Sequence, residues 1–286
     1  MKKYVWIGIT LAGIWMLFVY FTAAPNVENV IKYFPLDTSK TFTDAKTTLS
    51  FHDQKDTDEY EVDWETTSTS SEPMYLRQDL SLLYVNGQLR GILNKWKEDG
   101  QTIEQVTSIH GEDSSLYQAI TFHHGEVHYP EDVIKSIQKT SYDQLYVIDS
   151  PHTPLESFKQ PDNAQQKEWV DKLQHSLNQQ LDYQWDDLLL HFNIDVDNYV
   201  AVPLTDIQKF ENTAIPGVSQ QETSRILGQL WEGLYKNYVL GIADAKNSGH
   251  PIQSYIPLVL FDKNGTHLMV LFEDDKGNKE QLIQRY

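Results

Sequence analysis

Cysteine is absent from all 286 residues of the sequence. Its absence excludes structural disulfides, thiol catalysis and a lipoprotein-type acylated cysteine. A chain of this length can still bury a sizeable core without cross-links. Arginine is also scarce, with four residues against a larger number of lysines. Both features are compatible with an exported protein of a Gram-positive bacterium.

Basic residues are few compared with acidic ones. All 41 acidic residues but only 21 of the 23 basic ones follow residue 24, so this part carries a formal charge of −20. Such a surface disfavours binding to nucleic acid and to anionic lipid headgroups. We therefore expect no nucleic-acid partner, and the simplest explanation of the acidic residues is solubility.

Recognisable catalytic signatures are missing as well. The chain contains no G-x-S-x-G, no H-E-x-x-H and no phosphate-binding loop. The sequence therefore predicts no catalytic residue and no cofactor. It favours a protein that acts by binding.

The N-terminus carries one long apolar run. Tyr4 to Ala24 holds no charge, and as a helix it would span about 31 Å, enough to cross a bilayer core. The alternative is a cleaved signal peptide, whose apolar core is shorter. Cleavage after Ala24 would also place Pro25 next to the cut, where we expect it to block the peptidase. The run therefore predicts a single transmembrane anchor at residues 4–24.

The flanking charges predict the orientation of this anchor. Lys2 and Lys3 precede it, and the first acidic residue, Glu28, follows it. The positive-inside rule then places residues 1–3 in the cytoplasm and the bulk of the chain outside the cell. We expect a single-pass protein of the bacterial cell membrane.

Beyond the anchor, the patterns indicate a juxtamembrane tether at 25–48 and an extracytoplasmic domain at 49–286. Asn86-Gly87, Asp99-Gly100 and His124-Gly125 favour hairpin turns, which makes residues 49–130 rich in strands. Residues 251–286 contain further hairpins. The sequence contains no solenoid-type repeat, and it leaves open whether this region forms one or two subdomains.

Residues 131–250 are predicted to be mainly helical. Pro130 is placed to start a short helix, and apolar residues at three- and four-residue spacing run from about 163 to 192, with a break near Asp182. Ser219 and Glu222 form a capping box for a second strong helix, and Gly249 is placed to end it. The predicted fold class is therefore α+β, with helices packed on antiparallel sheet.

The stretch "ITFHHGEVHYPED", residues 120–132, is the main candidate for chemistry. A hairpin turning at His124-Gly125 would place Ile120, Phe122, Val127 and Tyr129 on the core side. His123, Glu126 and His128 would then face solvent. In a strand that runs straight through, His124 would replace His123 on the face shared with Glu126 and His128.

Two interpretations of these residues stay open. Two histidines and a carboxylate can bind Zn²⁺ or Fe²⁺, which makes His123, Glu126 and His128 candidate metal ligands. The interpretation we favour is that these residues form the solvated, polar side of a hairpin, because a hairpin tip is wet and no supporting shell of residues around such ligands is visible in the sequence.

Taken together, these features predict a membrane-anchored extracytoplasmic binding or regulatory protein of the cell envelope. Its partner would be another membrane or envelope protein, and the sequence leaves its oligomeric state open. The alternative is an envelope hydrolase or metal-binding protein built around the His123, Glu126 and His128 hairpin.

The topology can be tested directly. Protease added to intact protoplasts should degrade the C-terminal domain, because residues 25–286 lie outside the membrane. Immunoblotting with antibodies against the C-terminal residues measures this loss, and a cytoplasmic protein is the protected control. A protected domain would contradict the orientation, and a mature N-terminus at Pro25 would contradict the anchor.

Overall fold

The computed structural model describes residues 32–53, 59–151, 153–240 and 254–286. The predicted anchor at 4–24 and the short end at 1–3 lie outside these ranges. Among the described residues, no helix is both long and apolar enough to cross a membrane. The first strand begins at Phe42, so the segment predicted as a tether to residue 48 already forms part of the sheet.

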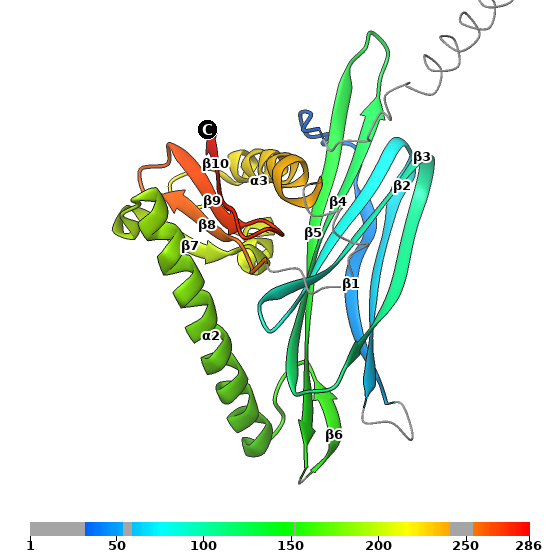
Figure 1. Ribbon diagram of the computed structural model, residues 1–286. Coiled ribbons are helices and arrows are strands. Elements are labelled where there is room, and N and C mark those ends of the chain that lie inside the picture. The colour runs from blue at the N-terminus through cyan, green and yellow to red at the C-terminus, as the bar shows by residue number, and fades with distance from the viewer. Residues whose placement is uncertain (1–31, 54–58, 152, 241–253) are drawn as a thin grey trace, which may run out of the picture. The chain divides into compact units, whose positions relative to one another are not determined.

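A large antiparallel sheet dominates the structure (Figure 1). Its strand order is β1-β2-β4-β5-β6, and β3 pairs with β2. The strands are β1 (Phe42–Asp53), β2 (Tyr60–Val85), β3 (Gln88–Gly111), β4 (Ser115–His128), β5 (Ile134–Ser150) and β6 (Thr153–Phe158).

This sheet curves until it nearly closes on itself. The register of β2 against β3 shifts between Thr69 and Met74; the first half of β2 pairs with β1 and the second half with β4. Side chains then join β1 to β5: Thr47 lies within 2.6 Å of the Ser141 hydroxyl, and the Leu49 N–H donates to Asp143 Oδ2 at 2.8 Å. Polar contacts rather than a backbone ladder therefore hold this seam.

The second half of the chain adds helices and a smaller sheet of order β10-β9-β8-β7. Its elements are α2 (Ala164–Phe192), η1 (Val196–Asn198), β7 (Tyr199–Pro203), η2 (Leu204–Glu211), α3 (Gln220–Leu234), the π-helical turn η3 (Tyr235–Val239), β8 (Leu258–Asp262), β9 (His267–Glu273) and β10 (Lys279–Arg285).

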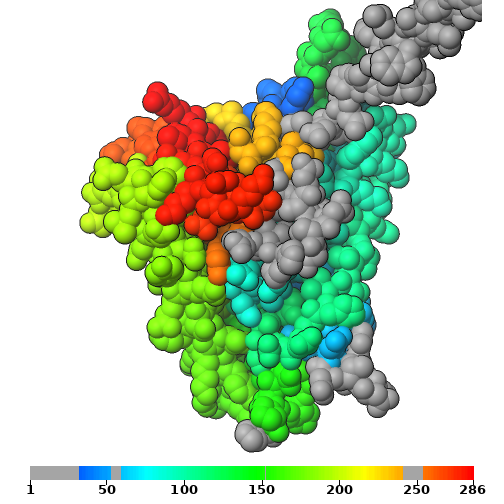
Figure 2. Space-filling view, viewed as in Figure 1, coloured from blue at the N-terminus to red at the C-terminus, as the bar shows by residue number. Residues whose placement is uncertain are grey.

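Helix α3 lies between the two sheets. Its Trp231 stacks on Phe122 of β4 with ring centroids 5.3 Å apart, and the Ile226 carbonyl accepts a hydrogen bond from Gln284 of β10. Helix α2 packs on the small sheet through Leu188 against Leu260 and its neighbours. Figure 2 shows α2 running along one side of this view, below the C-terminal strands.

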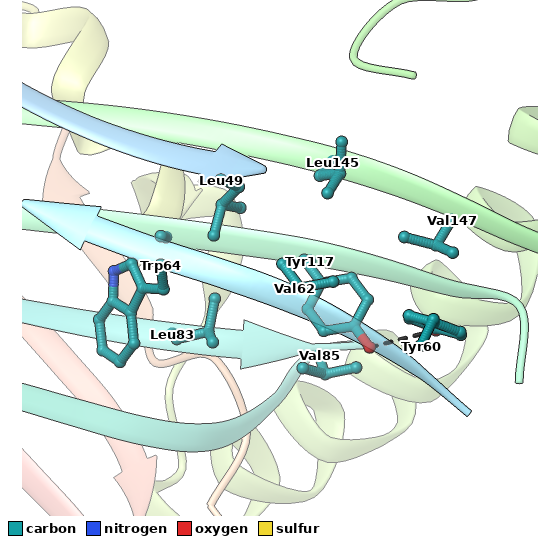
Figure 3. Packing of buried hydrophobic residues seen from close by; sticks show 10 residues of the cluster. Leu49, Tyr60, Val62, Trp64, Leu83, Val85, Tyr117, Leu145 and Val147 are labelled. Atoms are coloured by element: carbon teal, nitrogen blue, oxygen red, sulfur yellow. Dashed lines mark hydrogen bonds between the residues drawn. The ribbon is translucent and has the colours of Figure 1, made fainter. Parts of the chain in front are cut away.

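The interior of the curved sheet holds one apolar cluster and one polar cluster. Ten buried side chains from β1, β2, β4 and β5 make up the apolar cluster (Figure 3): Leu49, Tyr60, Val62, Trp64, Leu83, Val85, Tyr117, Ala119, Leu145 and Val147. Tyr117 donates to the Tyr60 hydroxyl at 3.1 Å, and Tyr60 in turn donates to the Asp113 carbonyl at 2.6 Å. The polar cluster lies further along the same strands.

The predicted α+β class is wrong. The structure is mostly antiparallel sheet, and the region predicted as mainly helical, 131–250, includes two further strands of the large sheet, β5 and β6. The predicted helix after Pro130 is strand β5. Glu131 and Asp132 have φ angles of 65° and 58°, which make a tight turn, and β5 then pairs with β4 from Ile134 onward. Long-range pairing outweighs the local helix signal here.

The two long helices are confirmed. Helix α2 covers 164–192 without the break predicted near Asp182. Ser219 caps α3 by accepting a hydrogen bond from the Glu222 N–H at 3.2 Å, as the capping box predicts. Gly249, the predicted end of this helix, lies outside the described residues.

The turn predictions have a mixed outcome. Asn86 and Gly87, with φ angles of 48° and 81°, form the predicted tight turn between β2 and β3. Asp99-Gly100 is not a hairpin turn. Asp99 has a φ of 46° within β3, opposite the register shift of β2, and so marks the bend of that strand pair.

The stack between β4 and α3 should dominate the stability of the domain. Phe122 is 1% exposed, so Phe122→Ala should lower the free energy of unfolding by about 3–5 kcal/mol. Urea unfolding followed by circular dichroism measures the change. Tyr183→Ala is the matched control because Tyr183 is 72% exposed, and it should change stability by less than about 0.5 kcal/mol. Similar losses from both variants would contradict this packing.

Candidate functional site

Three ionisable side chains meet inside the curved sheet. Arg77 and Asp79 come from β2 and His123 comes from β4, and each is 0% exposed. Successive residues of a strand face opposite sides, so the two-residue spacing of Arg77 and Asp79 directs both side chains to the same face. Burying such groups is costly unless they are paired and hydrogen-bonded.

Serine hydroxyls and a main-chain carbonyl form hydrogen bonds with the buried arginine and aspartate. Arg77 Nη1 donates to Ser70 Oγ at 3.0 Å and to the Gln101 carbonyl at 2.8 Å. Ser68 accepts from Arg77 Nη2 and donates to Asp79 Oδ2 at 2.5 Å. The Asp79 carboxylate itself lies 3.8 Å from Arg77 Nη2. Burial lowers the pKa of Arg77, and the nearby Asp79 opposes this shift.

His123 lies between Asp79 and a serine. Its Nδ1 is 3.1 Å from Asp79 Oδ2, and its Nε2 is 2.8 Å from Ser141 Oγ on β5. Carboxylate, imidazole and hydroxyl therefore follow one another in the order of a Ser-His-Asp acyl-transfer triad, but the contact between His123 Nδ1 and Asp79 lacks the geometry of a hydrogen bond. Such triads are recognised by geometry rather than by sequence position, so this line is a candidate catalytic group.

The hydroxyl groups beyond Ser141 bear on this interpretation. Thr47 donates to Thr121, which in turn donates to Ser81, both at 2.6 Å. Since each hydroxyl has one proton, Ser141 must donate to Thr47, and His123 Nε2 must then donate to Ser141. A triad needs the opposite, with Ser141 donating to the imidazole. Hydrogen bonds that run in this direction stabilise the sheet. They do not activate Ser141, because His123 donates to it instead of accepting its proton.

A cleft opens next to this cluster. It has a volume of about 200 Å³ and lies between the segment leading into β1, strand β5, η2 and α3. Phe42 separates it from the buried charges: the Phe42 ring is 4.7 Å from Arg77 Cζ and also lines the cleft. The lining residues are Leu36, Asp37, Lys40, Thr41, Phe42, Ile137, Gln138, Phe210, Glu211, Ser224 and Leu227.

Two carboxylates of the cleft have different environments. Burial by itself would raise the pKa of Asp37, but hydrogen bonds from Tyr129, Ser39 and the Lys40 N–H outweigh it and lower the pKa to about 2. Burial raises the pKa of Glu211 and outweighs its hydrogen bonds from Thr140, which include the N–H at 2.7 Å. Asp37 is thus fully engaged, whereas Glu211 is the less stabilised anion.

The hairpin predicted at His124-Gly125 is wrong. Strand β4 runs straight through it and pairs with β5 and with β2. A Cβ added at Gly125 would lie 3.1 Å from both Arg77 Cδ and Ile137 Cγ1, so glycine here makes room for neighbouring side chains. The turn at the end of β4 comes later, at Glu131-Asp132.

The predicted solvent-facing trio is therefore divided between two faces. His123 lies inside the sheet, while Glu126 and His128 share the opposite face with His124, as expected for a straight strand. Glu126 Oε2 is 3.4 Å from His128 Nε2, and His128 stacks on Tyr75 at 3.7 Å. Across the described ranges, no group of three potential ligands is close enough to hold a metal ion.

His124 also belongs to the protein interior. It is 2% exposed beneath α3, and its Nε2 lies 3.3 Å from Ser136 Oγ. Burial, together with the charge on Arg77, lowers its pKa to about 4. His124 is therefore neutral at physiological pH, and its contacts explain it as a packing residue of the interface with α3.

Sequence reasoning missed Arg77, Asp79 and Ser141. The signal that could have found the first two is the leucine-rich stretch "LRQDLSLL", residues 76–83, in which two opposite charges stand two positions apart. Two charges on one face of an apolar strand predict a buried pair. Nothing local marks Ser141, because it meets His123 only through the pairing of β4 with β5.

No model of a known protein family matches the chain, and no curated protein sequence matches it. The functional hypotheses therefore rest on the geometry of the cleft and of the buried cluster. Of these two features, the cleft contains solvent-accessible groups and the cluster is closed.

The charge balance of the cluster can be tested by one isosteric change. Asp79→Asn should lower the free energy of unfolding by about 3–5 kcal/mol, because it leaves the buried Arg77 without a counter-charge. Urea unfolding measures the loss. Glu65→Gln, at an exposed position of the same strand, is the control and should be nearly neutral. A stable Asp79→Asn protein would contradict the buried ion pair.

Proposed function

We propose that the protein is a membrane-anchored, extracytoplasmic binding module of the bacterial cell envelope that acts on another envelope protein without catalysis. The cleft beside Phe42 is the observation that carries this proposal. Binding sites are concave, largely preformed and combine apolar walls with polar groups that fix the orientation of the ligand. The cleft has five apolar or aromatic lining residues and six polar or charged ones, so it is a mainly polar site.

Hydrogen bonds keep the cleft in shape. The Asp37 N–H donates to the Ser136 carbonyl at 2.8 Å, and the Ser136 N–H donates to the Pro35 carbonyl at 3.0 Å. The Tyr33 N–H donates to Glu232 of α3 at 2.9 Å. The segment that leads into β1 is therefore fixed on both β5 and α3, which supports a preformed site.

The position of the cleft along the chain supports a role at the membrane. Residues 36–42 form one wall, and in sequence they follow the predicted anchor at 4–24 by little more than ten residues. Only a short stretch of chain would therefore separate a partner held in the cleft from the membrane. The acidic domain would in addition attract partners with basic surfaces.

In-cell cross-linking tests this function. A photo-activatable amino acid at Thr41, on the exposed rim of the cleft, should give an adduct with one envelope or membrane protein. The same group at Glu104, an exposed position on β3, is the control and should not give that adduct. Identical adducts from both positions, or none from the rim, would count against a binding module.

A second candidate function is acyl hydrolysis, favoured by the line of Asp79, His123 and Ser141. Ser141 Oγ would bond to the acyl carbon while His123 Nε2 takes the serine proton and passes it to the leaving group. Water would then release the acyl group by the reverse transfer. This function requires the chain of hydroxyls to reverse its direction, so that Ser141 donates to His123.

A fluorophosphonate probe separates the two functions. If Ser141 is an activated nucleophile, the probe should label it covalently, and both Ser141→Ala and His123→Gln should abolish labelling. Ser108→Ala, at an exposed serine of β3, is the control. Intact-protein mass spectrometry measures the adduct. An unlabelled wild-type protein that is correctly folded would rule out the hydrolase.

A further inference from the structure

Glu211 is the carboxylate of the cleft with unused capacity. Its Oε1 accepts the Thr140 N–H at 2.7 Å, and the nearest cation to its Oε2 is Lys139 Nζ at 4.0 Å, beyond hydrogen-bonding distance. The Glu211 side chain is 17% exposed and lines the cleft. Because burial raises the pKa of this carboxyl, a second cation would stabilise its charged form.

The other charged groups of the cleft are already paired. Asp37 accepts hydrogen bonds from Tyr129 and Ser39 at 2.6 and 2.7 Å, and Lys40 lies 2.6 Å from Glu72. A ligand would therefore meet Glu211 as the one under-compensated charge among the lining residues. This asymmetry favours a cation over an anion.

The walls around Glu211 suit an aliphatic stem that carries a cation. Phe42 and Phe210 present aromatic rings, and Leu36, Ile137 and Leu227 are apolar. Each ring already has a cation of the protein over it, Arg77 at Phe42 and Lys209 at Phe210, so the rings serve here as apolar surface. Lysine side chains bury their methylene groups along such surfaces. A volume of about 200 Å³ lies below the usual range for small-molecule sites and matches a single side chain better.

The number of Glu211 carboxylate oxygens open to a ligand decides whether lysine or arginine fits better. A guanidinium binds a carboxylate best through both oxygens, in a bidentate pair. Here the Thr140 N–H already occupies Oε1, and the Thr140 side chain also hydrogen-bonds this carboxylate, so the two oxygens are not both open to a guanidinium. A compact ammonium group needs only one acceptor, so lysine fits this carboxylate better than arginine.

We propose that the cleft binds a lysine side chain of the partner protein, with its ammonium group on Glu211 Oε2 and its stem between Phe42 and Phe210. This inference rests on the proposed binding function and gives the chemistry of its partner. Lys139 is the internal competitor, because it is the cation nearest to Oε2 and its side chain is 46% exposed.

Ligand-observed NMR on the full-length protein in detergent tests the site with blocked single amino acids. Nα-acetyl-lysine N-methylamide should bind saturably. Its Nε-acetylated form, which has no charge, should bind about tenfold more weakly or not at all, and the arginine analogue should be weaker than lysine. Equal binding of the charged and the acetylated lysine would overturn the proposal.

Two variants locate the site. Glu211→Gln should weaken lysine binding by about tenfold, and it should still fold because glutamine can accept the Thr140 N–H. Lys139→Met should tighten binding, since it removes the competitor. Glu222→Gln on α3 and Lys135→Met on β5, which do not line the cleft, are the matched controls. Unchanged binding in folded Glu211→Gln would place the ligand elsewhere.

The outcomes of this test and of the cross-linking at Thr41 are distinguishable. A specific adduct from Thr41 without lysine binding would overturn the lysine site and leave the binding function standing. Lysine binding that depends on Glu211, without any adduct, would support the site and count against a protein partner in the envelope.

Discussion

Burial of β4 on both faces is the constraint on which the rest of the structure depends. One face closes the interior of the curved sheet, and the other lies under α3, where Phe122 stacks on Trp231. Any polar side chain on a strand in this position has to form its hydrogen bonds with other protein groups rather than with water. His123 and His124 are consecutive residues that point to opposite faces and find partners in Ser141 and Ser136. The cleft then forms where the elements around β4 meet.

Filling the interior of a sheet with charged side chains costs stability. Replacing ion pairs by apolar residues is often neutral or stabilising, so a buried arginine needs a further reason. Here Arg77 lies against the ring of Phe42, which lines the cleft together with Glu211. The cluster and the cleft share this ring, so the polar contacts that close the sheet also fix the shape of the proposed site.

Local signals succeeded where the chain decides its own conformation. Asn86-Gly87 specifies a tight turn because both residues tolerate positive φ, and Ser219 caps α3 through the N–H groups that follow it. They failed at residues 120–140. There the histidines and Glu126 suggested the solvent-exposed side of a hairpin, because polar residues that alternate with apolar ones were expected to face water. In a strand buried on both sides, polarity no longer reports which face is exposed.

The sequence by itself determined the long helices, the C-terminal hairpins, the acidic balance and the absence of disulfides, because these follow from spacing and composition. The apolar run at 4–24 belongs to the same class of signal and remains a prediction. Only the tertiary structure decided that β5 is a strand, that Asp79, His123 and Ser141 lie in line, and that Glu211 faces a cleft. These features depend on which strands pair across the sheet, and pairing between segments far apart in the chain is set by the packing of the whole core.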